Sequence, residues 1–226
     1  MRAGLFLILL LTPAVCAAQD VAMMEMRSIL TTVSPTGDEL PKDAATLHKI
    51  QMFGRCLSQN NTAILSEPPE TDRDRRTIFG MSMTPQHCSR YGINPQYAPY
   101  FLRGVYAEFA LRKDFDLSKG TARGHPEKVF ALPTDAERAR LTTAQKATLS
   151  FVEYATCVAK VDMPGVVRVV ASEVGTDAEK QAFGALGPAL GQCLTAGMTL
   201  RVNRFKLRGY LAEGAYRHLS TKVDQK

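Results

Sequence analysis

The chain has 226 residues, with 28 lysines and arginines against 22 aspartates and glutamates, which gives a net charge of +6. The basic residues form no run of the kind that binds nucleic acid, so we expect no nucleic-acid partner. The Cys-x-x-Cys, His-Glu-x-x-His, Gly-x-Ser-x-Gly, Walker-type and Gly-x-Gly-x-x-Gly motifs are all absent from the sequence. We therefore expect no metal site and no cofactor.

The first 18 residues have the pattern of a secretory signal peptide. A positive charge at Arg2 is followed by the apolar run Leu5–Leu11, a break at Pro13 and small residues up to Ala18. The apolar run is shorter than the roughly 20 residues that a membrane-spanning helix needs. We expect cleavage after Ala18, an exported protein that is periplasmic or secreted, and no transmembrane segment in the mature chain. A lipid anchor on Cys16 stays open as an alternative.

An N-terminal arm precedes the first predicted helix. Residues 19–41 contain a short apolar piece followed by turn residues, and we interpret them as a partly ordered N-terminal arm. Between Leu47 and Leu57 the apolar residues recur at spacings of three and four. This pattern predicts an amphipathic helix that carries Cys56 near its C-terminal end.

The segment that closes this first unit occurs twice in the chain. Residues 102–112 read LRGVYAEFALR, and residues 207–217 read LRGYLAEGAYR, 105 positions later. The same offset relates Cys88 to Cys193, so the similarity continues upstream. We interpret this as an internal duplication. The two predicted helical repeats span residues 42–112 and 147–217.

Four cysteines remain after the signal peptide: Cys56, Cys88, Cys157 and Cys193. An even number in an exported chain indicates disulfides, because compartments outside the cytosol are oxidising. Each copy has one early and one late cysteine, so among the three possible pairings the duplication selects Cys56–Cys88 and Cys157–Cys193. The cysteines of the second pair are four residues further apart in the sequence than those of the first. We expect the four extra residues in a loop around 161–165.

Capping patterns predict where other helices begin. Thr71 and Thr176 are each followed three residues later by an acidic residue, as in a capping box. Asn94–Pro95 in the first copy and Thr199 in the second predict the starts of the closing helices. The sequence thus predicts an all-α fold of about four helices per repeat, packed as one body with pseudo-twofold symmetry.

Two polar segments flank the second copy. Residues 113–146 form a turn-rich connector, in which residues 135–141 are either a short separate helix or the start of the first helix of the second copy. Residues 218–226 are expected to form a polar tail that frays.

The chain resembles a group of uncharacterised exported bacterial proteins. The resemblance rests on the signal peptide and on two copies of Cys…Thr-x-x-acid…Cys…LRGxxAExxxR between Leu47 and Arg217. No activity is known for that group. The resemblance therefore implies export and duplication, and implies no mechanism.

The repeated segment supplies the candidate binding residues Arg103, Glu108, Arg208 and Glu213. The favoured interpretation is structural: Glu108 pairs with Arg112 one turn later in the same helix, an interaction worth about 0.2–0.5 kcal/mol. In a second interpretation, Arg103 and Arg208 face each other and bind a small anion, because guanidinium groups suit carboxylates and phosphates. In a third, Glu108 and Glu213 form the acid–base pair of a hydrolase.

We predict a non-enzymatic binding or interaction module of the cell envelope, with no catalytic residue, whose partner is an envelope protein or a small anionic ligand. The alternative is a hydrolase that uses Glu108 and Glu213 with Arg103 and Arg208. Six aromatic residues between Tyr91 and Phe109 are assigned to core packing rather than to a pocket for an apolar ligand.

Overall fold

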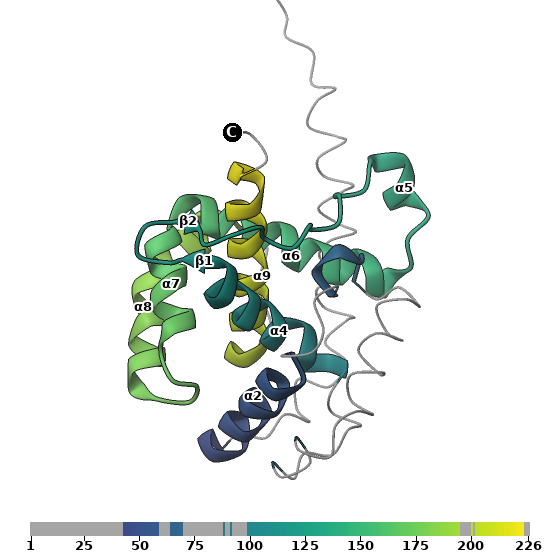
Figure 1. Cartoon of the computed structure of the whole chain (residues 1–226). Helices are drawn as coiled ribbons and strands as arrows, with labels where there is room; N and C mark the ends of the chain where they lie inside the picture. Colours follow the sequence, from purple (N-terminus) through teal and green to yellow (C-terminus); the bar gives the residue numbers. More distant parts are fainter. Residues whose placement is uncertain are drawn as a thin grey trace, which may run out of the picture.

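The computed structural model describes residues 43–58, 64–69, 88, 91, 99–194, 200 and 202–223. Over these residues the protein is mostly helical, as the sequence predicts (Figure 1). The predicted signal peptide, the N-terminal arm, Thr71 and the helix start at Asn94–Pro95 lie outside the described residues. None of the described helices is both long enough and apolar enough to cross a membrane.

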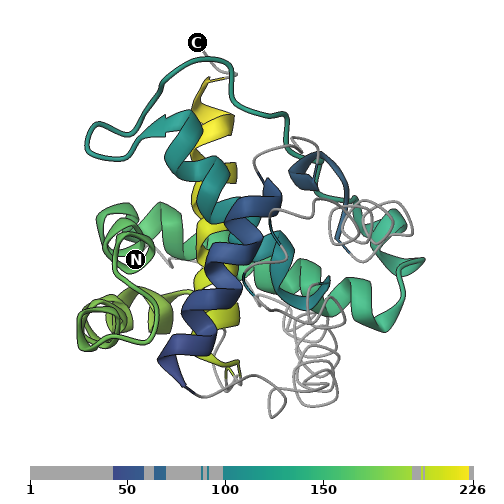
Figure 2. The same ribbon diagram turned by 60° about the horizontal axis from the view of Figure 1, so that its bottom comes forward.

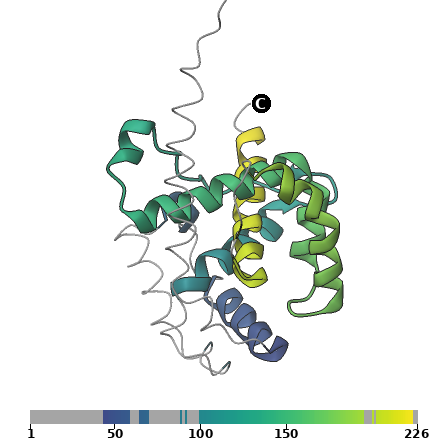
Figure 3. The ribbon, with the colours of Figure 1, turned by 180° about the vertical axis from the view of Figure 1, so that it is seen from behind.

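Helix α9, Arg204–Val223, lies between several of the other helices (Figures 1 and 3). It packs against α4, Pro99–Asp114, and against α6, Thr143–Val161. Residues 211–217 of α9 are all buried. This stretch has no solvent-facing side, which is typical of a helix enclosed by its neighbours.

Helix α2, Ala44–Ser58, packs against α4 and lies in front of it in Figure 2. Its buried residues include Ile50, Phe53 and Leu57, which confirms the amphipathic helix expected here. The short 3-10 helix η1, Ile64–Ser66, follows it and also contacts α4.

The second half of the chain continues from α6 into two further helices, α7 (Met163–Ala171) and α8 (Asp177–Gln192), which pack side by side. Asp162 lies between α6 and α7, and its side chain accepts a hydrogen bond from the Gly165 N–H at 2.8 Å. The loop expected around residues 161–165 was wrong, because only Asp162 separates the two helices and residues 163–165 already belong to α7.

The predicted start of α8 at Thr176 is confirmed, with a different arrangement of the acidic partner. The Thr176 hydroxyl accepts a hydrogen bond from the Glu179 N–H at 3.3 Å. The Glu179 carboxylate, however, accepts from the N–H of Gly175 rather than from that of Thr176. Its other oxygen is occupied by Arg208. The carboxylate thus links the start of α8 to α9.

The connector contains more regular structure than its polar composition predicts. Strands β1 (Phe115–Asp116) and β2 (Thr121–Ala122) pair as an antiparallel hairpin, and the turn between them includes Gly120 at a φ of 64°. Phe115 is fully buried, which anchors the hairpin to the helical body.

Residues 135–141 contain a separate short helix, α5 (Asp135–Ala139), which was one of the two possibilities that the sequence left open. Helix α6 then begins at Thr143, inside the segment predicted as connector. The reason is a capping box, in which Thr142 and Gln145 exchange hydrogen bonds between side chain and backbone.

Both predicted ends of α9 were wrong. Residues 202 and 203 are not helical, and the Asn203 side chain accepts from the Lys206 N–H at 2.8 Å, so Asn203 rather than Thr199 precedes the helix. Thr199 itself lies outside the described residues. At the other end α9 continues to Val223, because Leu219 and Ser220 are buried.

Both predicted disulfides are confirmed. The bond between Cys56 and Cys88 joins α2 to a point 32 residues later, and its Cα atoms are 5.9 Å apart. The bond between Cys157 and Cys193 joins α6 to the residue that ends α8, also with a Cα separation of 5.9 Å.

Candidate functional site

Helices α4 and α9 touch through their backbones where they cross. A Cβ atom added to Gly104 would lie 2.7 Å from the Cα of Gly209, and a Cβ on Gly209 would lie 2.7 Å from the Cα of Gly104. Only glycine at both positions permits this approach without a shift of the helices. The close contact brings the charged residues beside each glycine within reach of the opposite helix.

Arg103 of α4 forms a two-pronged ion pair with Glu213 of α9. Its Nε donates to Glu213 Oε2 at 2.9 Å, and its Nη2 donates to Glu213 Oε1 at 2.7 Å. Its Nη1 donates to the carbonyl oxygen of Ile64 at 3.0 Å. The planar guanidinium therefore matches the carboxylate while also fixing η1.

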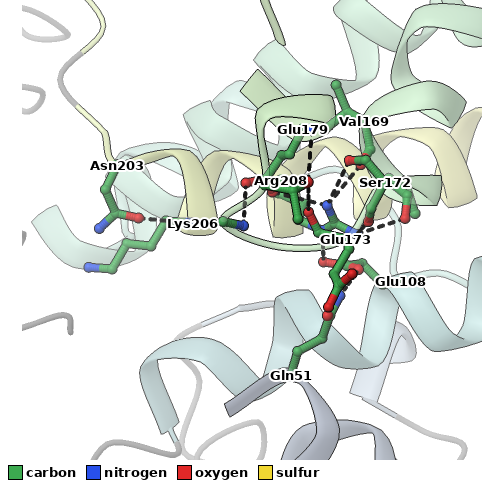
Figure 4. Close-up of polar contacts among 12 residues, drawn as sticks. Gln51, Glu108, Val169, Ser172, Glu173, Glu179, Asn203, Lys206 and Arg208 are labelled. Carbon is green, nitrogen blue, oxygen red and sulfur yellow. Dashed lines mark hydrogen bonds and ion pairs between the residues drawn. The ribbon is translucent and has the colours of Figure 1, made fainter. Parts of the chain in front are cut away.

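Arg208 of α9 has the converse arrangement. Its Nε donates to Glu108 Oε1 of α4 at 2.8 Å, and its Nη1 donates to Glu179 Oε1 at 3.0 Å. Nη1 and Nη2 also donate to the carbonyl oxygens of Val169 and Val170 at 2.8 and 2.7 Å. Figure 4 shows Arg208 close to Glu108, Glu179, Val169 and Ser172, and the Ser172 carbonyl accepts from Nη2 at 2.9 Å.

The second oxygen of Glu108 is occupied as well. It accepts a hydrogen bond from Gln51 Nε2 of α2 at 2.9 Å (Figure 4). Glu108 thereby connects α2, α4 and α9. Each partner satisfies part of the hydrogen-bonding capacity of a carboxylate that has left water.

The pairing within one helix that the sequence favoured was wrong. Among the ion pairs between described residues, none joins Glu108 to Arg112. The Arg112 guanidinium instead donates to the carbonyl oxygen of Val170. Arg217 donates to the carbonyl oxygen of Phe130 at 2.8 Å and lies over the Phe130 ring, with Cζ 4.1 Å from the ring centroid.

All four candidate residues converge on the α4–α9 contact, but they are enclosed there. The exposed fractions are 0% for Arg208, 8% for Arg103, 5% for Glu108 and 3% for Glu213. Every nitrogen of the Arg208 guanidinium donates to a protein group. A ligand anion at Arg208 would have to displace these partners, and the geometry is that of a structural network.

A separate open feature lies between α4 and the connector. A pocket of about 230 Å³ is lined on one side by residues of α4 and on the other by His125 and Glu127. The α4 residues follow a spacing of three and four and so share one helix face. They are Tyr106, Phe109, Ala110, Lys113 and Asp114.

Two tyrosines organise the polar groups of this pocket. The Tyr106 hydroxyl donates to Glu127 Oε2 at 2.7 Å, and the Tyr216 hydroxyl donates to Asp114 Oδ2 at 2.6 Å. The Tyr216 oxygen also accepts from the Glu127 N–H at 2.6 Å, while Glu127 Oε1 accepts from the Leu65 N–H at 3.1 Å. This network attaches the connector to α4, α9 and η1.

Burial is the main influence on the ionisable groups of the pocket. It raises the pKa of Glu127 above the ordinary 4.5, although the hydrogen bonds from Tyr106 and from backbone N–H groups act in the opposite direction. Burial and the nearby carboxylates also raise the pKa of both tyrosines, so their hydroxyls stay protonated and act as donors.

Sequence reasoning favoured core packing over a pocket for the aromatic residues of this region, yet Tyr106 and Phe109 line the pocket. Tyr106 was assigned to the core, which its exposed fraction of 3% supports, but its hydroxyl also holds a pocket carboxylate. The shared helix face of Tyr106, Lys113 and Asp114 was visible in the spacing. The contribution of Glu127 could not be predicted from the sequence, because tertiary contacts set the path of the connector.

The described residues define a disulfide-linked helical protein with an internal charge network. Within them, no group of three or more histidine, cysteine, aspartate or glutamate residues is placed to hold a metal ion. No protein-family model, no curated protein and no solved structure matches the chain.

Proposed function

We propose that the protein is an exported, non-enzymatic binding or interaction module of the cell envelope. The observation that carries this proposal is the enclosure of its charged motif. The four residues that repeat in the sequence are committed to one another in the interior. The charge network thus holds the helices together, and reversible binding is left to the surface and to the open pocket.

The proposal includes two tandem copies of one helical unit related by a pseudo-twofold axis. The crossed pairs support it, because Arg103 bonds to Glu213 while Arg208 bonds to Glu108. The carbonyl acceptors support it too: Ile64 and Val169 each lie 39 residues before the arginine that they bind. Such matched contacts are expected if both copies inherited one unit.

Export is supported by the two disulfides. Their Cα separations of 5.9 Å are ordinary for such bonds, and disulfides persist chiefly in oxidising compartments. The predicted signal peptide at residues 1–18 is the second support.

The hydrolase alternative has no contact in its favour. A general acid or base must reach the substrate, yet Glu108 and Glu213 are almost fully buried and each accepts from an arginine.

Expression of the full chain in a bacterium, followed by cell fractionation and intact-mass measurement, tests the export proposal. We expect the protein in the envelope fraction or in the medium, without residues 1–18 and with two disulfides. A lipid on Cys16 would identify the anchored form. Full-length cytosolic protein with four free thiols would contradict export.

Hydrolysis can be tested on the same material with ester, glycoside and peptide substrates. We expect no turnover that depends on Glu108 or Glu213. Turnover that disappears in folded Glu108→Gln and Glu213→Gln variants would establish the alternative.

A further inference from the structure

We propose that the pocket between α4 and residues 125–127 binds a small zwitterion that carries one ammonium and one carboxylate group, the chemistry of a free amino acid. This inference rests on the proposed function as a binding module and names its ligand class. It is carried by the free donors and acceptors that line the pocket.

The acceptor for the ammonium group is Asp114. Its Oδ2 atom is held by the Tyr216 hydroxyl, and its Oδ1 atom accepts no hydrogen bond from the described part of the chain. A carboxylate can accept through both oxygens, so Oδ1 is available. Glu127 lies on the opposite wall, but its own oxygens are engaged by Tyr106 and Leu65.

The donors for the ligand carboxylate are Lys113 and His125. Both side chains line the pocket and are exposed, and neither donates a hydrogen bond to another described residue. The two tyrosine hydroxyls cannot replace them, because each already donates to a carboxylate. The walls thus present free donors and a free acceptor together, which a molecule bearing both charges satisfies.

The dimensions of the pocket limit the ligand. Its volume of about 230 Å³ lies below the roughly 300–1,000 Å³ typical of pockets for drug-sized molecules. Phe109 and Ala110 provide a short apolar wall for a small side chain. A single amino acid fits these limits better than a nucleotide or a lipid.

The first experiment screens the free amino acids individually at millimolar concentration by isothermal titration calorimetry and by NMR of the 15N-labelled mature protein. We expect at least one to bind and to shift the resonances around His125. The decarboxylated and deaminated analogues of the best binder should each bind at least tenfold more weakly. Equal binding of either analogue, preferential binding of glucose, or no binding at all would overturn the proposal.

Variants assign the binding to this pocket. Lys113→Gln should weaken binding about tenfold, whereas Lys119→Gln, an exposed lysine in the hairpin turn, should leave it unchanged. Unchanged affinity in Lys113→Gln would overturn the assignment.

A second pair of variants separates contact from scaffolding. Asp114→Asn should weaken binding of the amino acid more than binding of its deaminated analogue, because it removes the ammonium partner. Tyr216→Phe removes the same internal hydrogen bond but keeps the carboxylate, and should retain that discrimination. If both variants lose affinity for both compounds equally, the ammonium contact is refuted. If the pocket binds no amino acid, the zwitterion proposal fails, while export and the absence of hydrolysis are still decided by their own experiments.

Discussion

Arg208 and Glu108 form an ion pair in the interior of the protein, with Nε and Oε1 2.8 Å apart and the arginine fully buried. Removing two charges from water is costly unless each is paired and its remaining hydrogen-bonding groups are satisfied. Here the carboxylate also receives Gln51, and the guanidinium also donates to Glu179 and to backbone carbonyls. The pair therefore fixes the contact between α4 and α9.

Arg103→Met should destabilise the protein strongly. It leaves Glu213 buried without its cation, and loss of one member of such a pair costs about 3–5 kcal/mol. Urea unfolding of the oxidised protein measures the change. The matched control is Arg138→Met, because its pair with Glu153 leaves 31% and 29% of the side chains exposed, and should cost no more than about 1 kcal/mol. Equal effects of the two changes would contradict the structural role.

Gly104→Ala should also destabilise the protein, although alanine favours helices. The new Cβ would lie 2.7 Å from the Gly209 Cα, so the helices must separate, at a cost of about 1–3 kcal/mol. Gly184→Ala in α8 is the control, because nothing lies within 4 Å of its Cβ position. That change should stabilise by about 0.5–1 kcal/mol. Thermal unfolding of both variants measures the two changes in stability. If both substitutions stabilise the protein, the close approach of the two helices at Gly104 is contradicted.

The similarity between the segments 102–112 and 207–217 made several features predictable from the sequence. The offset between copies selected the correct cysteine pairs, and the apolar spacing located α2. The charged residues of the repeat were recognised as belonging together. Their ion-pair partners were not predicted correctly. The spacing of Glu108 and Arg112 suits a pair within one helix, but the close approach of α4 and α9 at Gly104 places Glu108 beside Arg208 instead.

The remaining errors arise where tertiary contacts override local pattern. The connector was expected to be irregular, but burial of Phe115 and Phe130 orders it against the helices. The end of α9 was expected to fray, but Leu219 packs in the core. The pocket depends on the same contacts, since His125 and Glu127 come from the connector.

Removal of the second disulfide by Cys157→Ser and Cys193→Ser together should destabilise the protein by about 2–5 kcal/mol. The bond closes a loop between residues 36 positions apart and joins α6 to the end of α8. Guanidinium unfolding under non-reducing conditions measures the loss. Peptide mapping of the unmodified protein provides the control, and a Cys56–Cys157 linkage would contradict the pairing.

Stability should depend on pH through Glu127. Burial raises its pKa in the folded state above the ordinary 4.5, so the folded protein binds this proton more tightly than the unfolded chain does. The resulting stabilisation is present below pH 4.5 and is lost as pH rises through the higher folded pKa. Asp114, Lys113, His125 and the hydroxyls of Tyr106 and Tyr216 face the same pocket network.

Comparison with Glu127→Gln isolates this contribution, because most other titrating groups are common to both proteins. The difference in unfolding free energy, natural protein minus variant, should fall as pH rises above 4.5. Chemical unfolding at closely spaced pH values from 3 to 8 measures it. A difference that rises over this range would show that the folded-state pKa is lowered instead.

The most direct measurement is a pair of double-mutant cycles on the free energy of unfolding, with Glu108→Gln combined first with Arg208→Met and then with Arg112→Met. Residues in one buried network couple by about 0.5–3 kcal/mol, whereas an exposed pair within a helix contributes about 0.2–0.5 kcal/mol. We predict the larger coupling between Glu108 and Arg208. Stronger coupling of Glu108 to Arg112, with none to Arg208, would contradict the crossed network.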